Sequence, residues 1–176
     1  KILEDSKKNL SRCVCTLRPK SEGGLFTGKE DERKSILRLI AEYNPFLLDV
    51  EFNTIQKDKK LASYLKKSKC KLLISWHDFK KTPNESQLKS RFNKMRKFSN
   101  VVKIVTVAKN VSDASRVLSL YSIKSKSKTV AFCMGDQGKF SRILCLHLGS
   151  PFTYVSLGKA IAPGQFSVDE IKSLEN

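Results

Sequence analysis

Apolar runs alternate with helical patterns along the chain. Six short runs rich in apolar, β-branched and aromatic residues predict strands at 13–18, 46–52, 71–79, 101–108, 129–134 and 152–157. The segments between them place apolar residues at helical spacing, as Ile36, Leu39 and Tyr43 do at i, i+3 and i+7. Strands that alternate with helices favour a parallel sheet covered by helices, and runs that are apolar at both parities fit strands buried on both faces.

Three of the predicted helices have a recognisable start. A Ser or Thr followed three residues later by Glu is the signature of a capping box, in which each side chain accepts a hydrogen bond from the other residue's backbone N–H. The pairs with this spacing are Thr27 with Glu30, Thr82 with Glu85, and Ser167 with Glu170. We expect helices to begin at these points.

The repeated strand–helix unit leaves two architectures open, a doubly wound open sheet and a β/α barrel. No G-x-G-x-x-G sequence follows the first predicted strand and no P-loop sequence is present, which removes the usual nucleotide-binding reasons for the open sheet. A β/α barrel has eight units in about 250 residues. The 176 residues supply six units, so a barrel would lack two of its strands.

The charge balance is strongly positive, with 34 Lys and Arg residues against 17 Asp and Glu residues and a net charge of +17. Such a charge suits a nucleic-acid binder, and it also attracts small anions. The lysines occur in short clusters without the interleaved aromatic residues that stack on bases. This favours solvated helix faces, and a basic nucleic-acid-binding domain stays as an alternative.

Two absences from the sequence bear on location. No run reaches the roughly 18 to 20 apolar residues of a membrane span. The five cysteines contain no Cys-x-x-Cys pair, which argues against a zinc site and a disulfide framework and fits a reducing cytoplasm.

Two residues at predicted strand positions have chemistry that a buried strand does not need. Lys103 is the only charged residue in the run VVKIVTVA; a desolvated lysine is an amine nucleophile that can form a Schiff base, whereas a lysine near a strand end can also reach solvent through its flexible stem. His77 closes the run KLLISWHDF, at the end of a strand where α/β enzymes place catalytic groups, and it is a natural general acid or base.

Further charged residues lie at comparable positions. Asp49 and Glu51 share a parity in FLLDVEF, so both point to one side of that strand, where a carboxylate could orient a histidine. Arg18 ends its strand beside a Glu-Gly-Gly turn, and Arg142 follows the turn-rich stretch from Gly135; an arginine can bind a substrate carboxylate in bidentate fashion.

Seven segments together resemble a known family. They are TLRPKSEGGLFTG, LLDVEF, ISWHDFKKTP, VVKIVTVA, MGDQGKFSR, LGSPFTY and APGQ, in this order. The set resembles the type I 3-dehydroquinate dehydratases, the Schiff-base enzymes of the shikimate pathway, and the resemblance covers nearly the whole chain from Leu3.

The resemblance implies a catalytic role for three residues. Lys103 matches the lysine that forms an imine with the ring ketone of the substrate. His77 matches the general acid and base, and Glu51 the carboxylate that holds the histidine. The implied reaction is the dehydration of 3-dehydroquinate to 3-dehydroshikimate, without a metal ion or an organic cofactor. An aldolase that uses the same lysine chemistry stays as an alternative.

The resemblance also implies a set of substrate-binding residues. Arg142 matches the arginine that pairs with the substrate carboxylate, Arg18 a polar contact near the ring hydroxyls, and Gln165 a hydroxyl-binding residue on a closing loop. The apolar wall that excludes water from the imine would consist of Phe79, Met134 and Tyr154. The implied partner is a small anionic substrate, with no nucleic acid and no membrane, in a homodimer.

The family fold implied is a (β/α)8 TIM barrel, and two departures from the family pattern stand out. Ile161 occupies the position where the family usually has a substrate-contacting serine. The chain starts at Lys1 in what resembles the stretch after the family's first strands. We therefore expect residues 1–176 to form a single β/α-barrel domain that lacks one or two N-terminal strands.

Overall fold

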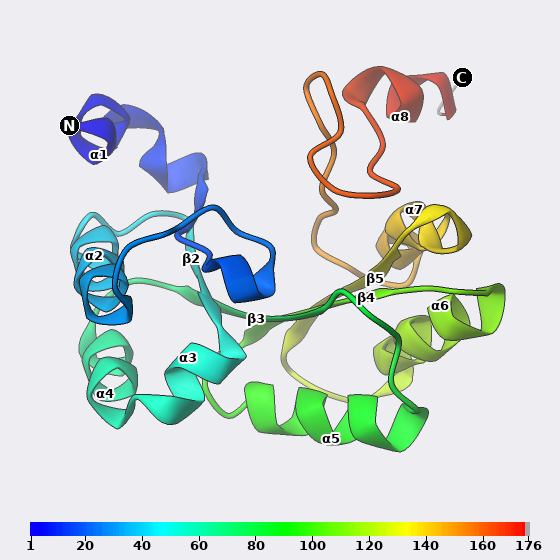
Figure 1. The fold of residues 1–176 in the computed structure, drawn as a ribbon, viewed down its shortest axis with the longest axis horizontal. Coiled ribbons are helices and arrows are strands. Elements are labelled where there is room, and N and C mark those ends of the chain that lie inside the picture. Colours follow the sequence, from blue (N-terminus) through cyan, green and yellow to red (C-terminus); the bar gives the residue numbers. More distant parts are fainter. Residues whose placement is uncertain (175–176) are drawn as a thin grey trace. The chain divides into compact units, whose positions relative to one another are not determined.

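The computed structural model describes residues 1–174, which form a β-sheet with helices in the connections (Figure 1). Within these residues the sheet has five strands in the order β1-β2-β3-β4-β5. Their bounds are β1 (Val14–Thr16), β2 (Leu47–Glu51), β3 (Leu72–Asp78), β4 (Val101–Val107) and β5 (Lys128–Met134). The pairs β1–β2 and β2–β3 are parallel. The first five predicted strands are therefore confirmed, and so is the parallel pairing where it is described.

The sixth predicted strand is wrong. Residues 152–155 have no regular structure, and Ser156 forms only an isolated bridge with Ser167. The aromatic residues that made this run look like a strand, Phe152 and Tyr154, instead pack as loop residues against a buried cluster, and Leu157 is 99% exposed. A strand needs a second strand to pair with along its length, and the pattern of apolar residues does not show whether such a partner strand is present.

Two compact units divide the chain. The first comprises Lys1–Trp76 and Lys94–Val102, and the second comprises His77–Asn93 and the chain from Lys103 onward. The division passes within β3 and β4, so each of these strands contributes residues to both units. The single barrel domain expected for residues 1–176 stays a prediction.

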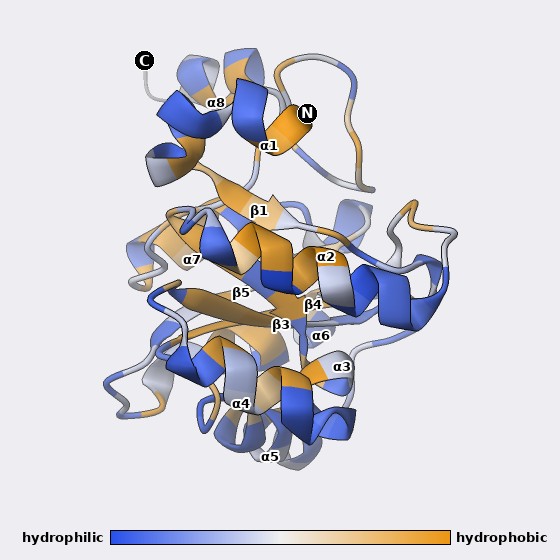
Figure 2. Ribbon diagram, turned by 90° about the vertical axis from the view of Figure 1, so that its left-hand side faces the viewer, coloured by the Kyte–Doolittle hydropathy of each residue, from blue (hydrophilic) through white to orange (hydrophobic). Residues whose placement is uncertain are grey.

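β2 is completely buried in the first unit, with all five of its residues shielded from solvent. α2 packs against β2 and α4, and α3 packs against β2 and α4. Leu37, Leu48 and Leu73 are fully buried in this unit. The apolar face predicted for α2 from Ile36, Leu39 and Tyr43 is wrong, because Leu39 is 51% exposed and the helix buries Leu37, Ile40 and Ala41 instead. The helices of this unit are α1 (Ile2–Asp5), η1 (Lys7–Arg12), η2 (Lys20–Glu22), α2 (Glu30–Glu42), α3 (Phe52–Lys57) and α4 (Lys59–Lys67). Figure 2 shows the hydrophilic colour on much of α4 and the hydrophobic colour along the strands.

The second unit has its core around β5. Val130, Phe132 and Met134 from this strand form a buried cluster with Val105 and Cys145. α6 and α7 pack against β5. The helices are α6 (Val111–Leu118), η3 (Ser119–Ser122), η4 (Asp136–Gly138), α7 (Ser141–His147) and α8 (Val168–Leu174), and α5 (Glu85–Met95) crosses the boundary between the units.

One of the three predicted capping boxes is confirmed. The Ser167 N–H donates to Glu170 Oε2 at 2.7 Å, and the Glu170 N–H donates to Ser167 Oγ at 3.1 Å. These reciprocal bonds satisfy two N–H groups that the first turn of α8 cannot pair internally.

The other two predicted capping boxes are wrong. α2 begins after Lys29 without a side-chain cap, because Glu30 binds Arg33 instead of a backbone N–H. α5 is capped by Asn84, whose Oδ1 accepts from the Gln87 N–H at 2.9 Å. The Thr82 hydroxyl is buried and donates to the Val107 carbonyl at 2.9 Å. Glu30 is thus engaged by a partner within its own helix, and Thr82 by a partner distant in the chain.

Within residues 1–174, none of the helices has both the length and the apolar composition that a membrane crossing requires.

Candidate functional site

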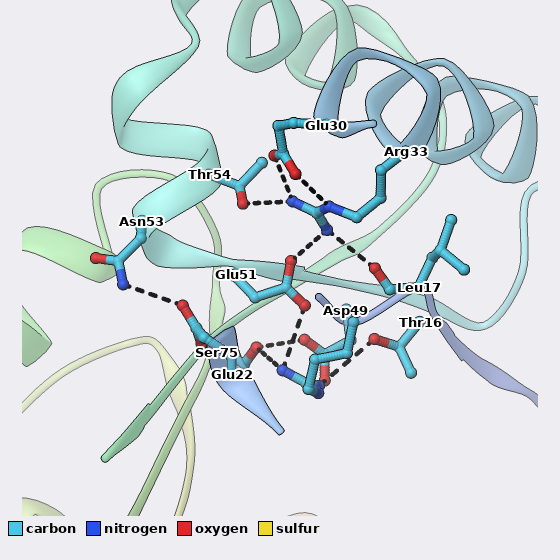
Figure 3. Close-up of polar contacts among 11 residues, drawn as sticks. Thr16, Leu17, Glu22, Glu30, Arg33, Asp49, Glu51, Asn53, Thr54 and Ser75 are labelled. Carbon is cyan, nitrogen blue, oxygen red and sulfur yellow. Dashed lines mark hydrogen bonds and ion pairs between the residues drawn. The ribbon is translucent and has the colours of Figure 1, made fainter. Parts of the chain in front are cut away.

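A cluster of charged side chains lies at the end of β2 in the first unit (Figure 3). Asp49 and Glu51 are each 1% exposed, and both face Arg18, which confirms that they lie on one side of the strand. Arg18 Nη2 lies 2.6 Å from Asp49 Oδ2, and Arg18 Nη1 lies 3.3 Å from Glu51 Oε1. Ser75, the neighbour of Glu51 in the β2–β3 register, donates its hydroxyl to Asp49 Oδ1 at 2.5 Å. Two buried carboxylates thus hold one arginine at a strand end.

Glu51 lies between two guanidinium groups. Its second oxygen, Oε2, accepts from Arg33 Nη1 at 2.7 Å. Burial raises the pKa of the Glu51 carboxyl, while the charges of Arg18 and Arg33 act to lower it. Both oxygens therefore have a cationic neighbour within the first unit. His77 belongs to the second unit, and the predicted role of Glu51 in holding it stays a prediction.

Glu22 is a buried carboxyl that the sequence reasoning did not select. It is 5% exposed, and its Oε1 accepts from Asn53 Nδ2 at 3.0 Å. Burial, followed by the charge of Glu51, raises its pKa to about 7. A group that titrates near neutrality at a cluster of charges is a candidate for proton transfer or for orienting a base.

The turn that contains Glu22 requires glycine. Gly23 has a φ of 78°, and a Cβ on Gly24 would lie 1.9 Å from the Arg18 carbonyl oxygen. Only glycine at position 24, two residues after Glu22, therefore allows the backbone to pack this closely against Arg18. The signal that could have found Glu22 was this Glu-Gly-Gly sequence, which begins four residues after a strand-end arginine.

Lys103 lies on β4, and its side chain belongs to the second unit. The residue is 7% exposed, and its Nζ lies 4.2 Å from the centre of the Tyr154 ring. The prediction of a buried lysine is confirmed, and the alternative of a lysine that reaches solvent is wrong. The structure therefore brings the predicted nucleophile together with one residue of the predicted apolar wall. Met134 lies in the cluster against which Tyr154 packs.

His77 lies at the end of β3 and is half-buried. Its ring stacks on Phe79, with ring centres 6.0 Å apart and planes inclined by 20°. Phe79 is 46% exposed, and it contacts the predicted base. The turn that follows is held by Asp78, whose Oδ1 accepts from the Lys80 N–H at 2.9 Å.

Arg142 is buried in α7 without an ion-pair partner among residues 1–174. Its guanidinium lies 4.6 Å from the centre of the Phe132 ring, and Nη2 donates to the Pro163 carbonyl at 3.3 Å. Its Nε has no hydrogen-bond partner in the described part of the chain. Burial lowers its pKa to about 10, so the group still carries its charge at neutral pH. A buried cation without a carboxylate is a suitable place for an anionic ligand.

The loop at 161–165 lies against the same part of the second unit. The Gly135 N–H donates to the Pro163 carbonyl at 3.3 Å. Gln165 Oε1 accepts from the Ile161 N–H at 2.9 Å, and Ile161 itself is 90% exposed. The carbonyl of Pro163 thus links this loop to Arg142. Gln165 stabilises the loop by accepting a hydrogen bond through its amide oxygen, and its amide nitrogen can still donate.

Metal binding has no candidate centre in the described part of the chain, because no group of three or more His, Cys, Asp or Glu side chains there could hold an ion.

A comparison with models of protein families shows to which family the chain belongs. The sequence matches the model of the "Type I 3-dehydroquinase" family over residues 1–175. The chain belongs to the type I 3-dehydroquinase family. Its fold class is therefore the TIM barrel of that family, as the resemblance implied.

Individual relatives of the type I 3-dehydroquinase chain are consistent with this assignment. A 3-dehydroquinate dehydratase of Pyrobaculum aerophilum is 42% identical over 158 residues, with 89% of this chain and 50% of that protein covered. The 3-dehydroquinate dehydratase of Methanocaldococcus jannaschii is 33% identical over 165 residues, with 92% and 74% covered. A crystal structure of the type I 3-dehydroquinate dehydratase of Clostridium difficile, with covalently modified comenic acid, superposes with a TM-score of 0.80 at 26% identity and with 90% and 65% covered.

The lengths of these relatives differ from that of the chain. The chain spans half of the length of the Pyrobaculum protein and 65% of the length of the Clostridium protein.

Proposed function

We propose that this type I 3-dehydroquinase chain is a hydro-lyase that converts 3-dehydroquinate to 3-dehydroshikimate in the shikimate pathway. The observation that carries the proposal is the buried amine of Lys103 beside the Tyr154 ring, in a chain whose relatives are named 3-dehydroquinate dehydratases. The family match favours dehydration over the aldolase reaction that an imine-forming lysine would also allow. The reaction needs an electron sink, a base and a donor for the leaving oxygen.

Lys103 is the proposed electron sink. Its amine adds to the ring ketone of the substrate, and loss of water gives a cationic imine. The imine draws electron density from the neighbouring carbon and makes its hydrogen acidic. The Tyr154 ring, whose centre lies 4.2 Å from Nζ, presents an electron-rich face to a cation at that position.

His77 is the proposed base and acid. Its imidazole removes the proton from the carbon beside the imine, and it then gives a proton to the departing hydroxyl, which leaves as water. Hydrolysis of the product imine consumes one water, releases the enone and restores the Lys103 amine. The net change is the loss of one water from the substrate.

Arg142 and Arg18 are the proposed binding groups for the substrate. Arg142 is buried, charged and without an ion-pair partner in the described part of the chain, which suits it to the substrate carboxylate. Arg18 would contact the ring hydroxyls, and Gln165 would add a hydroxyl contact from its loop. The apolar wall would consist of Phe79, Met134 and Tyr154.

Glu51 is the proposed group that orients His77, as the family resemblance implies. Arg18 and Arg33 are its cationic neighbours within the first unit. The variant Glu51→Gln tests this role: it should shift the titration of His77 in an NMR experiment, and an unchanged titration would remove Glu51 from the role.

The proposal also includes a homodimer in the cytoplasm that acts without a nucleic-acid or membrane partner, and without a metal ion or organic cofactor. Light scattering after gel filtration tests the dimer, and turnover after treatment with a chelator tests the metal independence.

A steady-state assay tests the proposed activity. The purified chain is mixed with 3-dehydroquinate, and the ultraviolet absorbance of the enone product is followed. We expect the absorbance to rise with the chain and to stay flat with Lys103→Ala, while Lys109→Ala, a change at a lysine in the turn after β4, serves as the matched control. A flat absorbance with the unaltered chain, or full activity of Lys103→Ala, would refute the proposal.

A further inference from the structure

Arg33 is a fully buried arginine that has no role in the proposed reaction. It lies in the first turn of α2, on the same helix face as Leu37, Ile40 and Ala41, and its exposure is 0%. A buried charge is costly unless it is paired and hydrogen-bonded. Its presence on the apolar face of a helix therefore requires a specific set of partners.

The Arg33 guanidinium has five N–H donors, and the structure pairs all of them. Nε and Nη2 donate to the two oxygens of Glu30 at 2.8 and 2.7 Å. Nη2 also donates to Thr54 Oγ1 at 2.6 Å, while Nη1 donates to the Leu17 carbonyl at 2.9 Å and to Glu51 Oε2 at 2.7 Å. These partners come from α2, α3, the end of β1 and the end of β2. The guanidinium is therefore held rigidly by four elements of the first unit.

This arrangement fixes the two oxygens of Glu51 in different directions. Oε2 is bound to Arg33, which leaves Oε1 to face Arg18 at 3.3 Å. Figure 3 shows the Glu51 carboxylate with one oxygen turned toward Arg33 and the other turned away from it. Arg18 is held on its other side by Asp49 at 2.6 Å. Arg18 Nη1 also donates to Ser75 Oγ at 3.1 Å. The position of Arg18 is thus set by Asp49 and Ser75 together with the charge of a carboxylate that Arg33 orients.

We propose that Arg33 is a positioning residue, which orients Glu51 and through it holds the Arg18 guanidinium in the geometry that receives the substrate. The inference rests on the proposed function, in which Arg18 contacts the substrate. Arg33 itself is buried behind Glu51 and touches no reacting group in this scheme.

The charges around Glu51 give Arg33 a second effect. The groups that act on Glu51 are the cations Arg18 and Arg33 and the carboxyls Asp49 and Glu22. Burial already raises the pKa of Glu51, and Arg33 is one of the two cations that oppose this rise. Without Arg33 the pKa of Glu51 rises further, and a protonated Glu51 no longer attracts Arg18. Loss of Arg33 should therefore weaken the hold on Arg18 most strongly at low pH.

The test compares Arg33→Met with Arg33→Lys. In Arg33→Met we expect KM to rise about 10- to 100-fold while kcat changes less than about threefold, because the lost contacts position a binding group and not a reacting one. We also expect the acidic limb of the pH profile of kcat/KM to move to higher pH. Arg33→Lys keeps the charge but has three donors in place of five, so KM should rise about three- to tenfold with the acidic limb nearly unmoved.

The matched control is Lys34→Met, which removes a positive charge from the next residue of α2. Lys34 is ion-paired with Asp58 and Asp31 and not with Glu51. We expect its KM and its pH profile to stay as in the unaltered chain. The unfolding midpoints of all variants are measured alongside, and kinetic values are normalised to the folded fraction.

The outcomes separate the proposal from a purely structural role and from failure of the proposed function. A folded Arg33→Met with unchanged KM and pH profile overturns the proposal; if Arg33→Met does not fold, an unchanged KM in Arg33→Lys overturns it. If the unaltered chain shows no turnover, the proposed function fails, and nitrogen NMR of the Arg18 guanidinium still decides the positioning. The proposal is supported if the Arg18 guanidinium rotates slowly in the unaltered chain and freely in Arg33→Lys or Arg33→Met. It is contradicted if the guanidinium rotates equally fast in all three chains.

Discussion

The Lys103 amine lies 4.2 Å from the centre of the Tyr154 ring, and the two residues come from a strand and from a segment without regular structure about fifty positions later in the chain. Lys103 is 7% exposed. A cation that is desolvated over an aromatic face is stabilised by the ring. The proposed imine is a cation at the same position, so Tyr154 should contribute to the reaction as well as to packing.

Replacement of Tyr154 by Leu should lower kcat/KM about 3- to 30-fold, because the aromatic face next to the cationic imine is removed. Tyr154→Phe retains the ring and should stay within about threefold of the unaltered chain. Steady-state kinetics on the two variants check this. Equal losses in both would assign the effect to the hydroxyl group and not to the ring.

The pH dependence of stability should contain a contribution from Glu22. Burial and the charge of Glu51 raise its pKa from 4.5 to about 7 in the folded chain. The folded state therefore binds more protons than the unfolded state between these two values, and this contribution to stability is full below about pH 4.5 and is lost as the pH rises to about 7. Glu22→Gln should remove this decrease, so the variant should gain on the order of 3 kcal/mol relative to the unaltered chain between pH 4.5 and pH 8.

Urea unfolding of both chains at several pH values measures this difference. A constant difference in the free energy of unfolding across the range would show that Glu22 titrates normally in the folded chain.

Replacement of Arg142 should weaken substrate binding without lowering the stability of the folded chain. Burial lowers its pKa to about 10, so the folded chain carries a cost for the charged group at every pH below that value, on the order of 3 kcal/mol. Arg142→Met should raise KM about 100-fold or more, because the proposed carboxylate contact is lost, while the free energy of unfolding stays equal or increases. The control is Arg116→Met, at an arginine on α6 that pairs with Asp113, whose KM should not change. A normal KM in Arg142→Met would remove this residue from substrate binding.

Gly24→Ala should disturb the position of Arg18 through the backbone. The added Cβ would lie 1.9 Å from the Arg18 carbonyl oxygen, whereas a Cβ on Gly158 would meet nothing within 4 Å. We expect Gly24→Ala to destabilise the chain by about 2 to 4 kcal/mol and to raise KM, and Gly158→Ala to leave both nearly unchanged. Thermal unfolding and steady-state kinetics on the pair check the expectation. Equal behaviour of the two variants would contradict the role of the turn.

The features that the sequence predicts well are those set by local pattern and by burial. The five described strands lie within or close to predicted runs, and Asp49 and Glu51 share a face because they share a parity. The burial of Lys103 decides between two alternatives that its place in an apolar strand left open. The Ser167–Glu170 cap also forms as predicted, because both of its partners lie within one turn.

The features that the sequence does not predict depend on partners that are distant in the chain. Arg33 occurs in the charged run EDERK and resembles a solvated residue of a first turn, but its partner Glu51 lies 18 positions away. Its spacing of four from the buried Leu37 was the one local signal. Thr82 likewise leaves its predicted cap for a buried contact with Val107.

Reductive trapping of the imine tests the central claim most directly. The chain is incubated with 3-dehydroquinate and borohydride, and its intact mass and peptide masses are measured. We predict a stable adduct of one substrate-derived group on Lys103, no adduct in Lys103→Ala, and an adduct in His77→Ala in spite of severely slowed turnover. Turnover by a chain that borohydride leaves unmodified, or an adduct on a different lysine, would contradict the Schiff-base account.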